Sequence, residues 1–585
     1  MALESTRRFR QYAKSCALMN QIPVHRMQRD SASKRSLEQC RTRLVFIAGL
    51  LLICYALLAV RIVDVSLLQA PDDTRTILAE NGIAPVIDND KVERGRIYDR
   101  TGELLAVSLP SHTLYAKPRI IDRFGAAEVA TKLSKIFPEL KREEVLKKLN
   151  PKRSFVYLKR HITPAQMEAV NTLGIPGLEF EKAMRRVYPH GNSFSHIVGF
   201  TDVDGNGLSA IEREFDKILG TKGEDVHLSV DARMQHILRD ELLNGMEEFR
   251  AIGGVGAIMD ITNGEIIALS SLPDFDPNEP KKASSDARFN RAVAGVYEMG
   301  STFKTFTTAM ALHHKTAKIF DRYDVTKPIK VSRYTIRDSH PENRWLTVPE
   351  IFMLSSNIGT VKMIMEVGKE RQQEFLEELG LFERSSIELP EVAMPLIPKT
   401  WRDINMMTIS YGHGISVTPM HLMQAIGTLL GDGKRLLPTL IKGGDITKQH
   451  RPQIISTETT AQLRKLMRLV VEHGTASKAN AEGYRVGGKT GTAEKVKGGS
   501  YADKDKLASF VGIFPSEAPR YVVLAMLDEP RGNKSTYGYA TGGWVAAPVV
   551  KRVIEKMAPI YGIRPIIELP SEGGSDKAKV REISF

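Results

Sequence analysis

The stretches that decide the fold of this chain are GSTFK at residues 300–304, SSN at 355–357 and GGKTGTA at 487–493. The first stretch places Ser301 three positions before Lys304. That spacing alone is weak evidence, because chance produces it in a chain of 585 residues, and Ser31 and Lys34 form a second example. All three stretches, in this order and spacing, are much harder to obtain by chance. Together they predict one active site.

Ser301 is predicted to be a nucleophile. The run that follows, TFTTAMALHHK (305–315), has the apolar spacing of a buried helix, so Ser301 falls in the first turn. Free N–H groups and the helix dipole favour negative charge there. Lys304 lies one turn further on the same face. A serine attacks only when a neighbour takes its proton, and a lysine can do so once burial and nearby positive charge lower its pKa.

The other two stretches supply further groups that such a site needs. Ser355 offers a hydroxyl for proton relay, Asn357 an amide for a substrate backbone, and Lys489 a second positive charge. The glycines beside Lys489 allow close approach of backbone segments, and the threonine hydroxyls suit a carboxylate. The predicted site therefore comprises catalytic Ser301, Lys304, Ser355, Asn357 and Lys489, and substrate-binding Thr490, Gly491 and Thr492.

The surrounding sequence predicts an α+β fold. Residues 254–273 are typical of a β-hairpin whose turn is Thr262-Asn263-Gly264, and residues 520–530 of a buried strand. Asp231 is a candidate N-cap of an amphipathic helix, and residues 544–557 indicate another helix. We therefore expect an antiparallel sheet flanked by helices over residues 226–560, followed by a frayed polar tail at 561–585.

The block upstream of the predicted catalytic domain shows no catalytic constellation. Residues 65–93 are expected to form an extended connector, and residues 126–150 have helical spacing. The charged residues of this block are expected mostly on solvated faces. Residues 65–225 are therefore predicted to be a non-catalytic pedestal, or dimerisation domain, that spaces the active site from a membrane and docks partners.

The N-terminal region predicts a membrane anchor. Residues 44–60 are seventeen residues without a charge, close to the length that crosses a bilayer. The 43 residues before them hold ten Lys or Arg and three acids, so by the positive-inside rule they stay in the cytoplasm. We expect a basic leader at 1–43, a transmembrane helix at 44–64 and the remainder in the periplasm. The alternatives are a buried core helix, a cleaved signal peptide and a leader that binds nucleic acid. A signal peptide fits poorly, because no A-x-A cleavage site follows the apolar run. No nucleic-acid partner is predicted.

Cysteine usage agrees with an oxidising exterior. The three cysteines are Cys16, Cys40 and Cys54, all in the leader or the span. The exterior therefore has no disulfide framework, no cysteine nucleophile and no cysteine-based metal site. The fourteen histidines show no metal-binding spacing. No metal and no cofactor are predicted.

At these motifs the chain resembles the class B penicillin-binding proteins, which carry Ser-x-x-Lys, Ser-x-Asn and Lys-Thr-Gly in this order. The resemblance extends over roughly residues 40–560 and looks closest to the division-specific D,D-transpeptidase branch. Further segments that are similar to that class are RGRIYDRTG (94–102), RRVYPHGNSFSHIVGF (185–200), NRAVAGVYEMGSTFK (290–304), YGHGISVTPMHL (411–422) and GGWVAAPVV (542–550).

The resemblance implies a serine β-lactamase-like domain that cross-links peptidoglycan stem peptides without metal or cofactor. Ser301 would attack between two D-alanines, with the oxyanion between the N–H groups of Ser301 and Thr492. A neighbouring stem amine would then resolve the acyl-enzyme, and β-lactams would acylate Ser301. The implied partners are the inner membrane and a polytopic glycan polymerase among other divisome proteins, with Arg61 and the span as candidate contacts or as a plain anchor.

Two residues depart from the family pattern. Met299 stands where proline is usual, and this could alter how the nucleophile helix is entered. His421 stands where glutamine is common. The leader is also longer than expected for the branch, and no function is assigned to it.

The alternatives within this chemistry are an elongation-specific transpeptidase, a class A β-lactamase, a β-lactam sensor and a bifunctional penicillin-binding protein. The last would need a Glu-Asp-x-x-Phe signature, which residues 65–225 lack. A catalytically dispensable scaffold is the non-enzymatic alternative.

Overall fold

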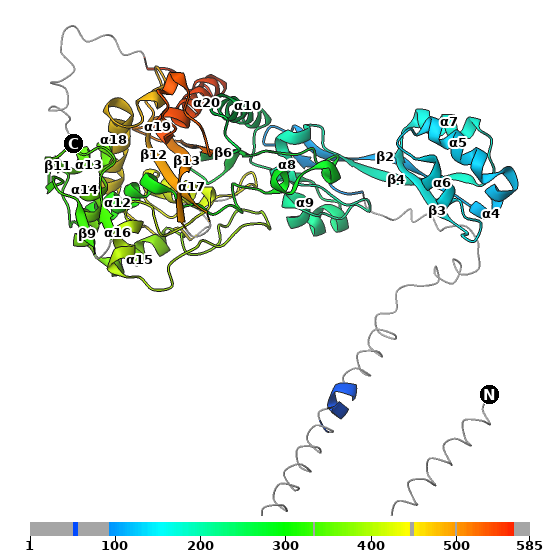
Figure 1. Cartoon of the computed structure of the whole chain (residues 1–585), viewed down its shortest axis with the longest axis horizontal. Helices are drawn as coiled ribbons and strands as arrows, with labels where there is room; N and C mark the ends of the chain where they lie inside the picture. Colours follow the sequence, from blue (N-terminus) through cyan, green and yellow to red (C-terminus); the bar gives the residue numbers. More distant parts are fainter. Residues whose placement is uncertain are drawn as a thin grey trace, which may run out of the picture. The chain divides into compact units, whose positions relative to one another are not determined.

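The computed structural model (Figure 1) describes residues 49, 51–56, 93–331, 334–444, 450–497 and 500–566. The chain divides into two units, residues 1–91 and 92–585. In the first unit, residues 49 and 51–56 are helical, and among the described residues no helix is long and apolar enough to span a bilayer. The predicted leader, most of the predicted span at 44–64 and the tail beyond residue 566 lie outside the described residues.

The catalytic block is built on a five-stranded sheet in the order β12-β13-β14-β6-β7, antiparallel throughout. The strands are β12 (Gly487–Lys497), β13 (Ser500–Phe514), β14 (Tyr521–Asp528), β6 (Gly253–Asp260) and β7 (Ile266–Leu272). Every residue of β6, β7 and β14 is buried, because helices cover both faces of the sheet. The predicted hairpin at 254–273 and the predicted strand at 520–530 are confirmed.

Helices α10 (Ala232–Phe249) and α20 (Ala547–Ile560) pack against each other and against this sheet (Figure 1). Asp231 caps α10 by accepting a hydrogen bond from the Arg233 N–H at 3.0 Å, as predicted. The helix expected at 544–557 is divided at Ala546, because a short helix α19 (Gly542–Val545) ends just before this residue and α20 begins just after it. Helices α17 (Pro419–Leu430) and α18 (Thr457–His473) also contact strands of the sheet.

While the third motif lies on β12 itself, a helical group beside this strand carries the first two motifs. Its central member, α12 (Lys304–His313), is buried over nine of its ten residues and contacts α14 and α18. The other members of this group are α13 (Val348–Leu354), α14 (Asn357–Val367), α15 (Lys369–Glu378) and α16 (Asp403–Ile409). The burial of α12 explains its nearly continuous run of small and apolar residues.

The upstream block has its own sheet and core. Strand β2 (Leu104–Ala116) pairs with three strands, β1 (Ile97–Tyr98), β3 (Val156–Ile162) and β4 (Leu178–Val187), and β1 also pairs with β5 (Val226–His227). A separate apolar core lies under α5 (Ala126–Ile136), α6 (Arg142–Lys148) and α7 (Pro164–Thr172). Helices α5 and α6 confirm the helical spacing predicted for residues 126–150.

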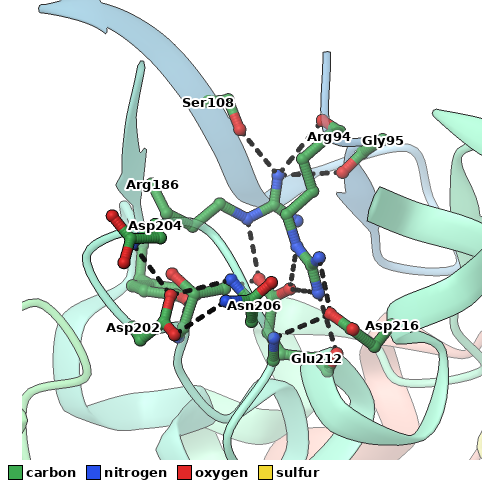
Figure 2. Close-up of polar contacts among 12 residues, drawn as sticks. Arg94, Gly95, Ser108, Arg186, Asp202, Asp204, Asn206, Glu212 and Asp216 are labelled. Carbon is green, nitrogen blue, oxygen red and sulfur yellow. Dashed lines mark hydrogen bonds and ion pairs between the residues drawn. The ribbon is translucent and has the colours of Figure 1, made fainter. Parts of the chain in front are cut away.

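A buried ionic cluster joins the segment just before β1, the end of β4 and α9 (Ala210–Glu214) (Figure 2). Glu212 is fully buried and accepts hydrogen bonds from the side chains of Arg94 and Arg186, both at 2.7 Å. Arg94 also donates to Asp216 at 2.8 Å, and Arg186 donates to the Gly95 carbonyl at 2.8 Å. The expectation that charged residues of this block mostly lie on solvated faces is wrong for these residues, because they are buried against partners that lie 26 to 122 residues away in the chain.

Candidate active site

Ser301 lies in a tight 3₁₀ turn, Gly300–Phe303, that leads directly into α12. We expected it in the first turn of an α-helix, but the α-helical residues begin at Lys304. Ser301 is partly exposed, while Lys304, three positions further on, is buried.

Glycines bring three backbone segments together around this turn. Gly300 has φ +53°, and a Cβ there would lie 2.6 Å from the Thr492 carbonyl oxygen. A Cβ on Gly412 would lie 2.0 Å from the Gly300 oxygen, and one on Gly491 would lie 2.7 Å from the Met299 oxygen. Any larger residue would separate the nucleophile turn from β12 and from the loop at 411–414.

Two buried lysines converge on Ser355. The Lys304 amine donates to the Ser355 carbonyl oxygen at 2.5 Å and to its hydroxyl at 3.1 Å. The Lys489 amine donates to the same hydroxyl at 3.0 Å. Ser355 itself has a left-handed backbone, φ +60°, at the end of α13. The three motifs therefore meet at one hydroxyl group.

Burial disfavours the charged forms of both lysines. Desolvation, helped by repulsion from Lys489, holds the pKa of Lys304 well below its usual range, while Asp338 opposes this by raising it. Desolvation lowers the pKa of Lys489 to about 7. A neutral amine is the form that accepts a proton, so this environment favours general-base chemistry at neutral pH.

Asp338 is a buried residue of this site that the sequence analysis did not identify. Its carboxylate accepts hydrogen bonds from the Ser356 hydroxyl at 2.7 Å and from the N–H groups of Asn357 at 2.5 Å and Ile358 at 3.0 Å. The Asn357 side-chain amide donates to the Arg337 carbonyl at 2.9 Å. No spacing rule connects an aspartate at 338 to the motif at 355–357, so only the structure reveals it.

The threonines of the third motif lie on β12, each with a hydrogen-bonding partner from another segment. The Thr490 hydroxyl lies 2.9 Å from the Thr475 hydroxyl, and the Thr492 hydroxyl accepts a hydrogen bond from the Gly542 N–H at 3.1 Å. Gly542 begins α19, within the segment 542–550. Thr475 was not predicted, because it follows α18 in a segment without a recognisable motif.

The two departures from the family pattern are accommodated locally. Met299 is buried at the entry to the nucleophile turn, and its carbonyl accepts a hydrogen bond from the Thr302 hydroxyl at 2.9 Å. His421 caps α17 through Thr418, whose hydroxyl lies 2.7 Å from its Nδ1. Since its Nε2 lies 2.8 Å from the Glu383 carbonyl, which only accepts, His421 donates there and is held as one tautomer.

Comparison with known proteins decides the family. Residues 254–555 match the model of the penicillin-binding protein transpeptidase domain. Residues 89–241 match that of the penicillin-binding protein dimerisation domain. The chain belongs to the class B penicillin-binding proteins. The resemblance inferred from the motifs is confirmed.

Relatives of this class B protein match most of its length. It is 39% identical to a probable peptidoglycan D,D-transpeptidase FtsI of Caulobacter vibrioides, over 83% of this chain and 84% of that protein. It is 34% identical to a probable peptidoglycan D,D-transpeptidase PenA of Neisseria meningitidis, over 81% of this chain and 85% of the relative. It is 28% identical to the peptidoglycan D,D-transpeptidase FtsI of Escherichia coli, over 81% of this chain and 84% of that protein.

A crystal structure of a peptidoglycan synthetase from Bifidobacterium adolescentis shares the fold. It matches this class B protein with a TM-score of 0.64 and 23% identity, covering 82% of this chain and 97% of that one. The predicted combination of an α+β catalytic domain, with its sheet flanked by helices, and a separate upstream domain is confirmed at this level.

Proposed function

We propose that this class B penicillin-binding protein is a peptidoglycan D,D-transpeptidase that acts through an acyl-enzyme on Ser301. The observation that carries the proposal is the convergence of two buried lysine amines on the Ser355 hydroxyl, within 3.1 Å. One of these lysines is one turn away from Ser301. A serine beside a buried amine of lowered pKa is an activated nucleophile.

In the first step, Ser301 attacks the carbonyl carbon between two D-alanines at the end of a stem peptide. Neutral Lys304 takes the hydroxyl proton, and Ser355 relays it towards the leaving nitrogen, with Lys489 bonded to the same hydroxyl. The N–H groups of Ser301 and Thr492 hold the oxyanion. Terminal D-alanine leaves with the proton, and an ester to Ser301 remains.

In the second step, an amine from a neighbouring stem peptide attacks the ester and forms the cross-link. The same groups then act in reverse, and Ser301 recovers its proton. The hydroxyls of Thr490 and Thr492, with Gly491 between them, receive the substrate carboxylate beside Lys489, and the Asn357 amide binds substrate backbone. A β-lactam presents the same carbonyl and carboxylate, so it acylates Ser301 but is released slowly.

The remaining regions are assigned by the same proposal. Residues 1–43 form a cytoplasmic leader, and 44–64 anchor the chain in the inner membrane. Residues 65–225 form the pedestal and 226–560 the periplasmic transpeptidase domain, with the tail at 561–585. We assign the enzyme to cell division, together with a polytopic glycan polymerase and other divisome proteins, because relatives named FtsI match over four fifths of the chain.

The test is gel labelling of membranes with a fluorescent penicillin. Wild type, Ser301→Ala and the control Ser31→Ala are compared at equal amounts of inserted protein. Labelling should vanish only with Ser301→Ala. Folded wild type that takes no label, or a labelled Ser301→Ala variant, would overturn the assignment. Localisation of the labelled enzyme to the septum or the lateral wall separates division from elongation, and loss of growth with Ser301→Ala excludes a mere scaffold.

A further inference from the structure

Asp338 holds the N-terminal end of α14, the helix that begins within the second motif. One carboxylate oxygen accepts the N–H groups of Asn357 and Ile358, and the other accepts the Ser356 hydroxyl. Ser356 in turn caps α14 by accepting the Gly359 N–H at 3.0 Å. The side chain is 9% exposed. These bonds satisfy helix N–H groups that otherwise lack partners.

Ser355, the residue immediately before this capped turn, needs such support. Its left-handed conformation, φ +60° and ψ 42°, is unfavourable for a residue with a side chain. The conformation persists because the chain is held on both sides of Ser355. The Ser355 N–H donates to the Phe352 carbonyl at 3.3 Å, and Asp338 accepts hydrogen bonds from the residues that follow. It is this backbone that points the Ser355 carbonyl at the Lys304 amine.

Asp338 also acts on charge. Two charged groups act on the buried Lys304: Lys489 on β12, which repels the protonated amine, and Asp338, which attracts it. The carboxylate therefore raises the pKa of Lys304, which desolvation and Lys489 both lower. Without it, the lysine would give up its proton at a still lower pH.

We propose that Asp338 is a positioning residue of the acyl-transfer site, whose carboxylate fixes the Ser355–Ser356–Asn357 turn and supplies the negative charge that balances Lys304 against Lys489. The inference rests on the proposed function, because it concerns the same proton transfer. Asp338 acts through the turn and through Lys304.

The experiment measures the second-order rate constant for acylation by fluorescent penicillin from pH 5 to 9, with full-length protein in detergent. Asp338→Asn keeps an oxygen for the two backbone N–H groups but removes the charge. We expect the acid limb of the profile to move about one unit lower in pH. Ser356→Ala keeps the charge but removes a hydrogen bond of the turn, so its plateau should fall several-fold while the acid limb stays.

Asp324→Asn is the matched control. Asp324 is another aspartate of the same segment, and it accepts hydrogen bonds from the N–H and hydroxyl of Thr326. Its profile should coincide with that of the wild type. An acid limb of Asp338→Asn that coincides with the wild type, in a variant with wild-type melting behaviour, overturns the proposal. Labelling of Ser301→Ala in the same assay would overturn the proposed function instead, so the two failures are distinguishable.

Discussion

The amine of Lys489 lies 3.0 Å from the hydroxyl of Ser355, although 134 residues separate them in the chain. Lys489 comes from the edge strand of the sheet, and Ser355 from the junction of two helices. Because Lys304 donates to the same hydroxyl, this serine joins the two buried lysine side chains of the site.

Lys489→Met should stabilise the protein near pH 7 while abolishing acylation. The pKa of Lys489 in the folded state, about 7, lies below the ordinary 10.5, so the unfolded chain binds more protons between these values. The contribution of neutral Lys489 to stability is fully present above pH 10.5 and is lost as pH falls through 7, by about 5 kcal/mol. Thermal unfolding from pH 6.5 to 9.5 should show that the difference in stability between Lys489→Met and the wild type decreases as pH rises. A constant difference would contradict the lowered pKa.

Gly300→Ala should lower the acylation rate by at least tenfold, because a Cβ lies 2.6 Å from the Thr492 oxygen and β12 must move. Gly174→Ala is the control: its φ of +59° is nearly the same as the +53° of Gly300, but its Cβ meets nothing within 4 Å. Both variants carry backbone strain of about 1 kcal/mol. Penicillin-labelling rates are measured on equal amounts of folded protein, so that the effect of the clash is separated from that of backbone strain. Equal labelling rates for Gly300→Ala and Gly174→Ala would contradict the proposed clash with β12.

His421→Gln should be tolerated, whereas His421→Leu should lose about 1–3 kcal/mol by leaving the Glu383 carbonyl and the Thr418 hydroxyl without their partner. Burial lowers the pKa of His421 to about 4, below the ordinary 6.5. Its contribution is therefore present above pH 6.5 and is lost as pH falls through 4. Denaturant unfolding between pH 4 and 7 should show that the free energy of unfolding falls less steeply with decreasing pH in the glutamine variant than in the wild type. Identical pH slopes would argue against a neutral buried histidine.

Glu212→Ala should destabilise the upstream block by about 3–5 kcal/mol, because it leaves two arginines buried without their shared carboxylate (Figure 2). Asp204→Ala breaks a largely exposed pair with Arg160 and should cost less than about 1 kcal/mol. Chemical unfolding gives both values. The fraction of Glu212→Ala that remains folded should still label at Ser301, since the cluster shares no residue with the site. Equal stability losses for the two variants would show that burial of this cluster contributes nothing.

Local patterns in the sequence predicted individual elements well. The Asp231 cap, the hairpin turn at Thr262-Asn263-Gly264 and the strand at 520–530 depend on neighbouring residues, and all were found. The break at Ala546 and the 3₁₀ turn at Ser301 were missed. Helix α19 packs against β12 and β13, and the turn at Ser301 packs against β12, and no local pattern records such contacts.

The sequence by itself determined the candidate active-site side chains, their order and the family, since these depend on residue identity and spacing. Only the tertiary structure decided their charge states, because the pKa of Lys304 depends on burial and on Lys489 and Asp338, which reach it from distant parts of the chain. The same holds for Arg94 and Arg186, whose burial is stable only with Glu212 between them. Residue types are local properties of a chain, whereas solvent exclusion and charge balance arise only when the chain closes on itself.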